Sequence, residues 1–165
     1  DSSQSFESYL EKSYCKTASL IANSSKAIGV LSNVDQDSLD SLYFFGKQLG
    51  LAFQVVDDIL DFTGNDEQLG KPAASDLQSG YLTAPVFYAL DENPTLGDLI
   101  SGKFNKKDDL DKALSLVRDS SAISKSRELA EKFASESKDS ISWLPDSPSK
   151  KALLELPEFV ISRLY

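Results

Sequence analysis

Four polar side chains, closely spaced in an apolar run over residues 50–64, are the residues of this sequence best suited to chemistry. They are Gln54, Asp57, Asp58 and Asp61. Wound as an α-helix, these residues fall at i, i+3, i+4 and i+7, which places them in one stripe along one face. The remaining positions are almost all apolar, and a helix that is apolar nearly all round is normally buried. Three carboxylates on such a helix need a compensating partner, because ionised groups are costly away from water.

A divalent cation is one such partner. Two carboxylates about 6 Å apart repel by roughly 3 kcal/mol at an effective dielectric constant of about 20. Carboxylate oxygens suit hard cations such as Mg²⁺, which keeps several waters and often completes its shell with substrate phosphates. The alternative is a solvated helix end with Gly64 as its C-terminal cap. The stretch alone leaves both interpretations open, although acidic side chains near a helix C-terminus oppose the helix dipole and favour a functional cause.

The sequence also predicts the elements that position this stripe. Helical periodicity predicts a first helix over residues 6–31 and a second, stripe-bearing helix over 37–62, with Asp35 or Asp37 as its N-terminal cap. Small residues on the first helix, at Ala22, Ser25 and Gly29, would let a neighbouring helix approach closely.

The polar stretch over residues 64–79 is too long for a simple connection, which indicates an active-site loop. Asp76 is expected to cap the helix entered near Leu77. Further helices are predicted over 81–91, 95–100, 108–118, 122–142 and 147–165, the last of them kinked or interrupted by Pro157, and residues 1–5 are expected to be frayed. The fold class is therefore all-α, an antiparallel helical bundle.

Composition narrows the possible function. A chain of 165 residues with 41% hydrophobic residues is long enough for one domain with a real core, and no stretch approaches the roughly 18 uninterrupted apolar residues of a membrane span. The net charge of −9 argues against nucleic acid as a partner. There is no His, so metal or acid–base chemistry must use other groups, and the single Cys15 cannot form an internal disulfide. The absence of Met suggests an excerpt or a processed product.

Several blocks, in this order, resemble one family. Phe53-Gln54 followed by Asp57-Asp58-Ile-Leu-Asp61, and then Gly70-Lys71, resembles the second aspartate-rich region of the trans-type polyprenyl diphosphate synthases. Residues 14–20 and 76–85 are similar to the segments before and after that region. A single DDxxD motif has low specificity, but these blocks together are strongly specific. The resemblance covers nearly the whole chain and is closest to the long-chain, solanesyl type of cyanobacteria and plastids.

The resemblance implies that residues 1–165 are the C-terminal portion of a single all-α domain of the isoprenoid synthase type. It also implies the reaction, in which an allylic diphosphate ionises and its cation is attacked by the double bond of isopentenyl diphosphate. In the family, two aspartate-rich helices face each other and hold Mg²⁺ against the leaving diphosphate. Asp57, Asp58 and Asp61 match the second of them. We rank Asp57 first as a ligand, with Asp58 and Asp61 acting partly through water.

The same resemblance assigns roles to four further residues, and the ring of Phe53 makes it a fifth candidate. Lys16 and Lys71 match the diphosphate-contacting lysines, and Thr17 and Gln54 match positions that line the reacting centre. Phe53 could offer its ring face to a cation. Other interpretations stay open: a snorkelling Lys16, a solvated Lys71, a helix back-bond from Thr17, a buried amide pair for Gln54 and simple core packing for Phe53.

The sequence departs from the family because the first aspartate-rich helix and the basic residues that grip isopentenyl diphosphate are absent. We therefore expect negligible synthase activity from these 165 residues alone, with the remaining helices on the full-length chain or on an associated one. The family implies a homodimer in a bacterial cytoplasm or a plastid, not a secreted protein. Product length and primer are not fixed by the sequence.

Two alternatives remain: a non-catalytic regulatory subunit of a heteromeric synthase, and a class I terpene cyclase. The intact aspartates and lysines argue against the subunit, because a protein relieved of catalysis need not keep them. The Lys16-Thr17 and Gly70-Lys71 blocks favour an elongating enzyme over a cyclase.

Overall fold

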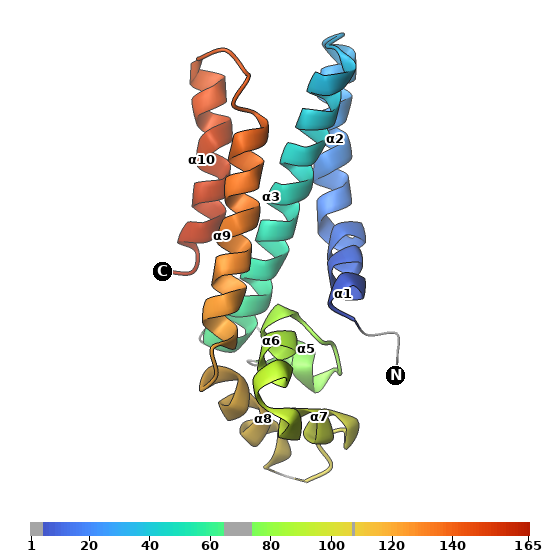
Figure 1. Ribbon diagram of the computed structural model, residues 1–165, viewed down its shortest axis with the longest axis vertical. Coiled ribbons are helices and arrows are strands. Elements are labelled where there is room, and N and C mark those ends of the chain that lie inside the picture. The colour runs from blue at the N-terminus through green and yellow to red at the C-terminus, as the bar shows by residue number, and fades with distance from the viewer. Residues whose placement is uncertain (1–4, 65–73, 107) are drawn as a thin grey trace. The chain divides into compact units, whose positions relative to one another are not determined.

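The structure is a computed structural model that describes residues 5–64, 74–106 and 108–165 (Figure 1). All regular structure in these ranges is helical, which confirms the all-α class. The elements in chain order are α1 (Phe6–Ser13), η1 (Tyr14–Ala18), α2 (Ser19–Leu31), α3 (Gln36–Thr63), α5 (Ser75–Gln78), α6 (Ala84–Glu92), α7 (Pro94–Ser101), α8 (Asp109–Arg118), α9 (Ala122–Ser140) and α10 (Pro148–Ser162). Within the described ranges, no helix is long and apolar enough to cross a membrane.

The chain divides into two compact units. The long-helix unit comprises Leu10–Val56 and Leu129–Tyr165, and the short-helix unit comprises Asp1–Tyr9 and Asp57–Glu128. In the long-helix unit, α2 runs antiparallel to α3, and α9 and α10 form a second antiparallel pair (Figure 1). The stripe-bearing helix α3 is unbroken from Gln36 to Thr63, so it contributes its first turns to one unit and its last turns to the other.

Small residues bring α3 close to the helix before it in the chain. A Cβ atom placed on Gly50 would lie 2.4 Å from the Cα atom of Ala18, and one on Gly46 would lie 2.6 Å from the Ile21 carbonyl oxygen. Ala18 and Ala22 are themselves fully buried. The two backbones are therefore nearly in contact, which confirms the close approach expected from Ala22.

The predicted first helix is one helical path, but its middle turn is not α-helical. Residues Tyr14–Ala18 form a π-helical turn, in which the Ser19 amide donates a hydrogen bond to the Tyr14 carbonyl five residues earlier. A π-turn holds one residue more than an α-turn and so changes the phase of the side chains on either side of it. Nothing in the apolar periodicity of the sequence predicts this change.

The boundaries of the stripe-bearing helix agree closely with the prediction. The structure has Gln36–Thr63 where the sequence predicted 37–62. Its cap is Asp35, whose carboxylate accepts the Ser38 amide at 2.8 Å. The final helix, α10, continues through Pro157 without interruption. The predicted interruption of that helix was therefore wrong.

The predicted loop over residues 64–79 is partly helical. Its second half contains α5, preceded by Ala74 in a left-handed conformation at φ 55°. Asp76 lies inside α5 and does not cap it, so that prediction was wrong. The Asp76 amide instead donates to the Asp61 carboxylate at 3.3 Å, which means that a side chain from another helix supplies the acceptor. Lys71 and its neighbours in 65–73 lie outside the described residues.

The short-helix unit has its own apolar core. Its largest fully buried side chains, drawn from α3, α5, α6, α7 and α8, are Phe62, Leu77, Val86, Leu96 and Val117. The Arg118 guanidinium donates to the Phe62 carbonyl at 3.0 Å, close to the C-terminal end of α3. This core therefore holds the last turns of the stripe-bearing helix in place.

Candidate functional site

The polar stripe of α3 is buried rather than solvated. The exposed fractions of Gln54, Asp58 and Asp61 are 7%, 3% and 1%, and Asp57 is half-buried. For Asp58 and Asp61, the alternative of a solvated helix end is therefore excluded. Because a buried carboxylate is stable only with hydrogen-bond or ionic compensation, the groups around each one decide what it can do.

Asp58 accepts a hydrogen bond from a residue that the sequence analysis did not single out. The Tyr9 hydroxyl donates to the Asp58 carboxylate at 2.7 Å, with both residues buried. The Tyr9 ring lies 5.6 Å from the Phe6 ring and 6.0 Å from the Phe87 ring, centroid to centroid. This aromatic cluster fixes the ring that carries the hydroxyl. Nothing in the sequence around Tyr9, which lies between Glu7-Ser8 and Leu10-Glu11, indicated this contact.

Asp61 organises the start of α5. Its carboxylate accepts the Ser75 hydroxyl at 3.2 Å and the Asp76 amide at 3.3 Å. Its backbone carbonyl accepts the Ala74 amide at 2.7 Å. One residue of α3 thus fixes the chain directly after the segment that contains Lys71. In the structure, Asp61 therefore positions the start of α5, whereas the sequence analysis gave it only the role of a metal ligand.

The arrangement of the acidic side chains limits how they could hold a magnesium ion. In the part of the chain that the structure describes, no three or more acidic or Cys side chains lie close enough together to hold a metal ion. Magnesium does not require such a cage, because one or two carboxylates, waters and substrate phosphates commonly complete its shell. Asp57 supplies a hard, half-buried carboxylate of the right kind. The chemistry of this donor is therefore compatible with a Mg²⁺ ion that takes a single protein carboxylate.

Two predicted site residues meet directly. The Thr17 hydroxyl, in the π-turn, donates to the side-chain oxygen of Gln54 at 2.8 Å. This hydrogen bond joins η1 to α3 and accounts for the buried amide. The helix back-bond considered for Thr17 is thus replaced by a contact between helices. Lys16, in the same π-turn, is exposed.

Phe53 offers its ring face to a cation that belongs to the protein. The guanidinium carbon of Arg163, at the C-terminal end of α10, lies 4.7 Å from the centroid of the Phe53 ring. Such a contact is worth about 0.5–2 kcal/mol, depending on desolvation. Arg163 had no predicted role, because nothing in sequence spacing relates position 163 to position 53. Phe53 and Gln54, adjacent in α3, are thus held from two different helices.

Fold and site together define a class of protein: an all-α bundle with a buried aspartate-rich helix, as in the isoprenoid synthases. Comparison with known proteins makes this specific. Residues 1–117 match the family described as Polyprenyl synthetase. The chain belongs to this family.

Curated relatives support the assignment. The chain is 53% identical over 165 residues to a prenyl transferase of Synechocystis, covering 100% of this chain and 51% of that protein. It is 44% identical over 158 residues to the chloroplastic solanesyl diphosphate synthase 2 of Arabidopsis thaliana, covering 96% of this chain and 38% of that protein. The chain thus spans about half, or less, of the length of these relatives.

Solved structures share the fold. The apo form of an Arabidopsis medium/long-chain length prenyl pyrophosphate synthase matches with a TM-score of 0.87 and 38% identity, over 98% of this chain and 56% of that one. Heptaprenyl diphosphate synthase from Staphylococcus aureus matches with a TM-score of 0.91 and 31% identity, over 98% of this chain and 52% of that one. The expected bundle of the isoprenoid synthase type is therefore confirmed.

Proposed function

We propose that the whole protein carrying this chain is a chain-elongating prenyltransferase that adds isopentenyl diphosphate to an allylic diphosphate. In this reaction, the allylic C–O bond breaks and diphosphate leaves. A C–C bond forms to the terminal alkene carbon of isopentenyl diphosphate, and a proton is lost. The observation that carries the proposal is a single helix, α3, on which a buried, hydrogen-bonded Gln54 is followed by the aspartates. The names of the relatives support the same activity.

The chain's own residues divide the work of holding the leaving diphosphate. Bound Mg²⁺ would neutralise the charge that develops on that group. Asp57 would hold the ion directly, while Asp58 and Asp61 would act through water, because both already accept hydrogen bonds from protein donors. Lys16 would contact the diphosphate as a point charge, and so would Lys71, which lies outside the described residues.

The remaining residues would orient the reacting carbons. The hydrogen bond from Thr17 fixes the plane of the Gln54 amide, so that its oxygen and the hydroxyl keep a constant position. Preorganised dipoles of this kind stabilise developing charge without reorganising during the reaction. The Arg163 guanidinium lies over the Phe53 ring. Phe53 would therefore form an apolar wall of the site and would not itself stabilise the carbocation. A homodimer in a plastid or a bacterial cytoplasm belongs to the same proposal, which rests on the resemblance and on relatives from cyanobacteria and chloroplasts.

The test uses the whole protein with radiolabelled isopentenyl diphosphate, an allylic primer and Mg²⁺. A ladder of longer diphosphates is expected. The absence of product would favour a regulatory subunit, and a cyclised hydrocarbon would favour a terpene cyclase.

Asp57→Ala tests the metal assignment. We expect turnover to fall about a thousandfold or more, equivalent to roughly 4 kcal/mol of activation free energy, with unchanged helical circular dichroism. Asp37→Ala, at an exposed position in the first turn of the same helix, is the matched control and should keep its turnover. Normal elongation by Asp57→Ala would remove Asp57 as the metal ligand.

A further inference from the structure

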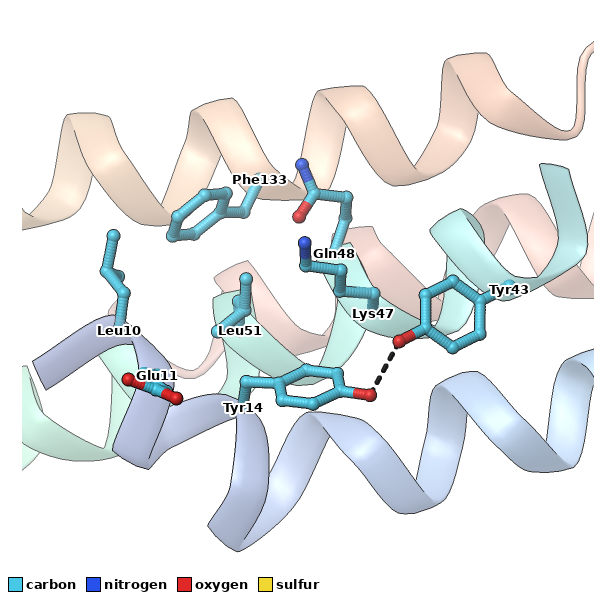
Figure 2. A pocket seen from close by; sticks show the side chains of 8 residues that line it. All are labelled: Leu10, Glu11, Tyr14, Tyr43, Lys47, Gln48, Leu51 and Phe133. Atoms are coloured by element: carbon cyan, nitrogen blue, oxygen red, sulfur yellow. Dashed lines mark hydrogen bonds between the residues drawn. The ribbon is translucent and has the colours of Figure 1, made fainter. Parts of the chain in front are cut away.

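Three tyrosine hydroxyls differ in the kind of hydrogen-bond partner that they have. Tyr14 and Tyr43 line a cavity of about 460 Å³ in the long-helix unit, and their hydroxyls lie 2.5 Å apart, bonded to each other (Figure 2). The Tyr9 hydroxyl, in the short-helix unit, instead donates to the carboxylate of Asp58 at 2.7 Å. Of the three, Tyr9 is therefore the tyrosine whose hydroxyl bears on the aspartate-rich stretch of α3.

The Tyr9 ring is held by other aromatic rings. Tyr9 is 7% exposed, and its ring centroid lies 5.6 Å from that of Phe6 and 6.0 Å from that of Phe87. The Phe6 ring in turn lies 5.8 Å from Phe87, edge to face, and 5.5 Å from Tyr88. Aromatic rings packed at these distances stabilise one another beyond simple burial. The cluster, drawn from α1 and α6, therefore holds the hydroxyl of Tyr9 at a fixed place.

The hydrogen bond from Tyr9 restricts the Asp58 carboxylate. The terminal torsion of an aspartate is broad and roughly two-fold, so that packing alone orients the carboxylate poorly. Here one of the two carboxylate oxygens accepts the hydroxyl, inside a residue that is 3% exposed. Because the hydroxyl is neutral, this hydrogen bond orients the carboxylate without cancelling its charge. The charge that a cation would meet on α3 is thus kept while its direction is set.

The two buried aspartates of α3 are oriented from different parts of the short-helix unit. The Asp61 carboxylate accepts hydrogen bonds from residues at the start of α5, 14 and 15 positions later in the chain. Asp58 is held from α1, 49 positions earlier. A substitution at Tyr9 can therefore change the orientation of one aspartate and leave every residue of the acidic stripe in place.

We propose that Tyr9 is a positioning residue of the diphosphate site, whose hydroxyl holds the Asp58 carboxylate in the orientation in which α3 takes up Mg²⁺ together with a diphosphate. This inference rests on the proposed function. It gives Tyr9 no contact with the substrate, so that Tyr9 acts through Asp58. Residues that hydrogen-bond to the ligands of a metal site typically change metal affinity or activity by about 10- to 100-fold when they are removed.

The test measures the binding of inorganic diphosphate to the whole protein by isothermal titration calorimetry, over a series of Mg²⁺ concentrations. Tyr9→Phe keeps the ring and removes the donor, and the Mg²⁺ concentration that gives half-maximal binding is expected to rise about tenfold or more. Tyr43→Phe is the matched control, because it also removes a tyrosine hydroxyl and its hydrogen bond, but that hydroxyl is bonded to Tyr14. It should bind diphosphate as the wild type does. Equal shifts in the two variants would show a general structural effect and would overturn the proposal.

A double-mutant cycle tests whether Tyr9 acts through Asp58. Asp58→Asn keeps an oxygen that can accept the Tyr9 hydroxyl but removes the charge. Adding Tyr9→Phe to Asp58→Asn should raise the Mg²⁺ requirement by less than about threefold, because residues that act through one contact do not add independently. A full tenfold rise in the Asp58→Asn background would place the effect of Tyr9 elsewhere and would contradict the proposal.

Each remaining outcome also decides. An unchanged Mg²⁺ requirement in a folded Tyr9→Phe protein would overturn the proposal. If Tyr9→Phe does not fold, Phe6→Leu replaces it, since this change keeps the hydroxyl but removes a ring that packs against it. A rise of about threefold or more is then expected, and no rise would overturn the proposal. A wild-type protein that gives no elongated product contradicts the proposed function instead. Because diphosphate binding is measured without elongation, the two failures are distinguishable.

Discussion

The two halves of α3 are held by opposite kinds of contact. In the long-helix unit, Gly46 and Gly50 allow backbone to touch backbone at Ala18 and Ala22. In the short-helix unit, the helix presents carboxylates that accept hydrogen bonds from other segments, as Asp58 does from Tyr9. An added atom is therefore expected to cost most near Gly46 and Gly50, and a lost hydrogen-bond donor to cost most at the buried aspartates. The positions where stability is most sensitive to added volume and those where it is most sensitive to a lost hydrogen bond lie in different parts of α3.

Adding one methyl group at Gly50, where the backbone of α3 meets that of Ala18, should give the largest loss of stability. Gly50→Ala places a Cβ atom 2.4 Å from the Cα atom of Ala18, and backbone cannot yield as a side chain can. Overpacking costs about 3 kcal/mol and more where backbone must shift, so the net loss should exceed about 2 kcal/mol even after the roughly 1 kcal/mol that replacing Gly by Ala gains inside a helix. Urea unfolding of the whole protein would measure the difference in the free energy of unfolding.

Gly97→Ala is the matched control for that substitution. It lies inside α7, where the nearest atom to a new Cβ is a Leu90 methyl at 3.7 Å. Because nothing there is crowded, the higher helix propensity of Ala should dominate and raise the free energy of unfolding by up to about 1 kcal/mol. Equal effects at positions 50 and 97 would contradict the steric account of the α3 contact.

Removing the Tyr9 hydroxyl, which donates to Asp58 in the last turns of α3, should give the next largest loss of stability. Tyr9→Phe keeps the ring among Phe6 and Phe87 but removes the donor to the buried Asp58 carboxylate. Hydrogen bonds to charged groups are worth about 1.5–3 kcal/mol, so we expect a loss of about 2 kcal/mol in urea unfolding. Tyr81→Phe, at a ring that is 66% exposed, should change nothing measurable. A silent Tyr9→Phe would show that the carboxylate does not depend on this donor.

The smallest effect is expected where a polar contact lies at the surface of the short-helix unit. The Lys125 ammonium, 2.8 Å from Glu92, together with the Ser121 hydroxyl and amide, lowers the pKa of the Glu92 carboxyl from 4.5 to about 2. A carboxyl whose pKa is lowered by folding stabilises the fold above its unfolded pKa and loses this contribution as the pH falls.

Glu92→Gln should therefore destabilise the protein modestly at neutral pH, and the difference from wild type should shrink as the pH falls from about 4.5 to about 2. Thermal unfolding across this range would measure it. Lys125→Gln removes the largest cause of the shift and should weaken the same pH dependence. A difference that is constant with pH would exclude the charged contact as its origin.

The sequence was sufficient for features that residue size and hydropathy encode locally. The bounds of α3 were predicted within one residue at each end, and Ala22 correctly indicated a close helix contact. Features that depend on distant partners were missed. The roles of Tyr9 and Arg163 follow from tertiary contacts with residues 58 and 53, and no periodicity within one helix contains that information.

The candidate site was predicted to a similar extent. The acidic stripe and the pairing partners Thr17 and Gln54 were all named in advance, although the hydrogen bond that joins the latter two was not. The assignment of Asp76 as a cap failed because the acceptor comes from Asp61, a residue of a different helix. Local capping rules assume that the cap is a neighbour in sequence, and here it is not.

The π-turn at Tyr14–Ala18 makes this segment tolerant of one kind of change in length. Because the turn holds one residue more than an α-turn, deleting one of its residues would let the helix close as an ordinary α-turn, with the segments on either side close to their present phase. The same deletion within an ordinary α-turn of α1 or α2 would instead rotate the two flanking segments by about 100° relative to each other. A single-codon deletion is therefore expected to be accepted at the π-turn and rejected in the α-helical turns before and after it.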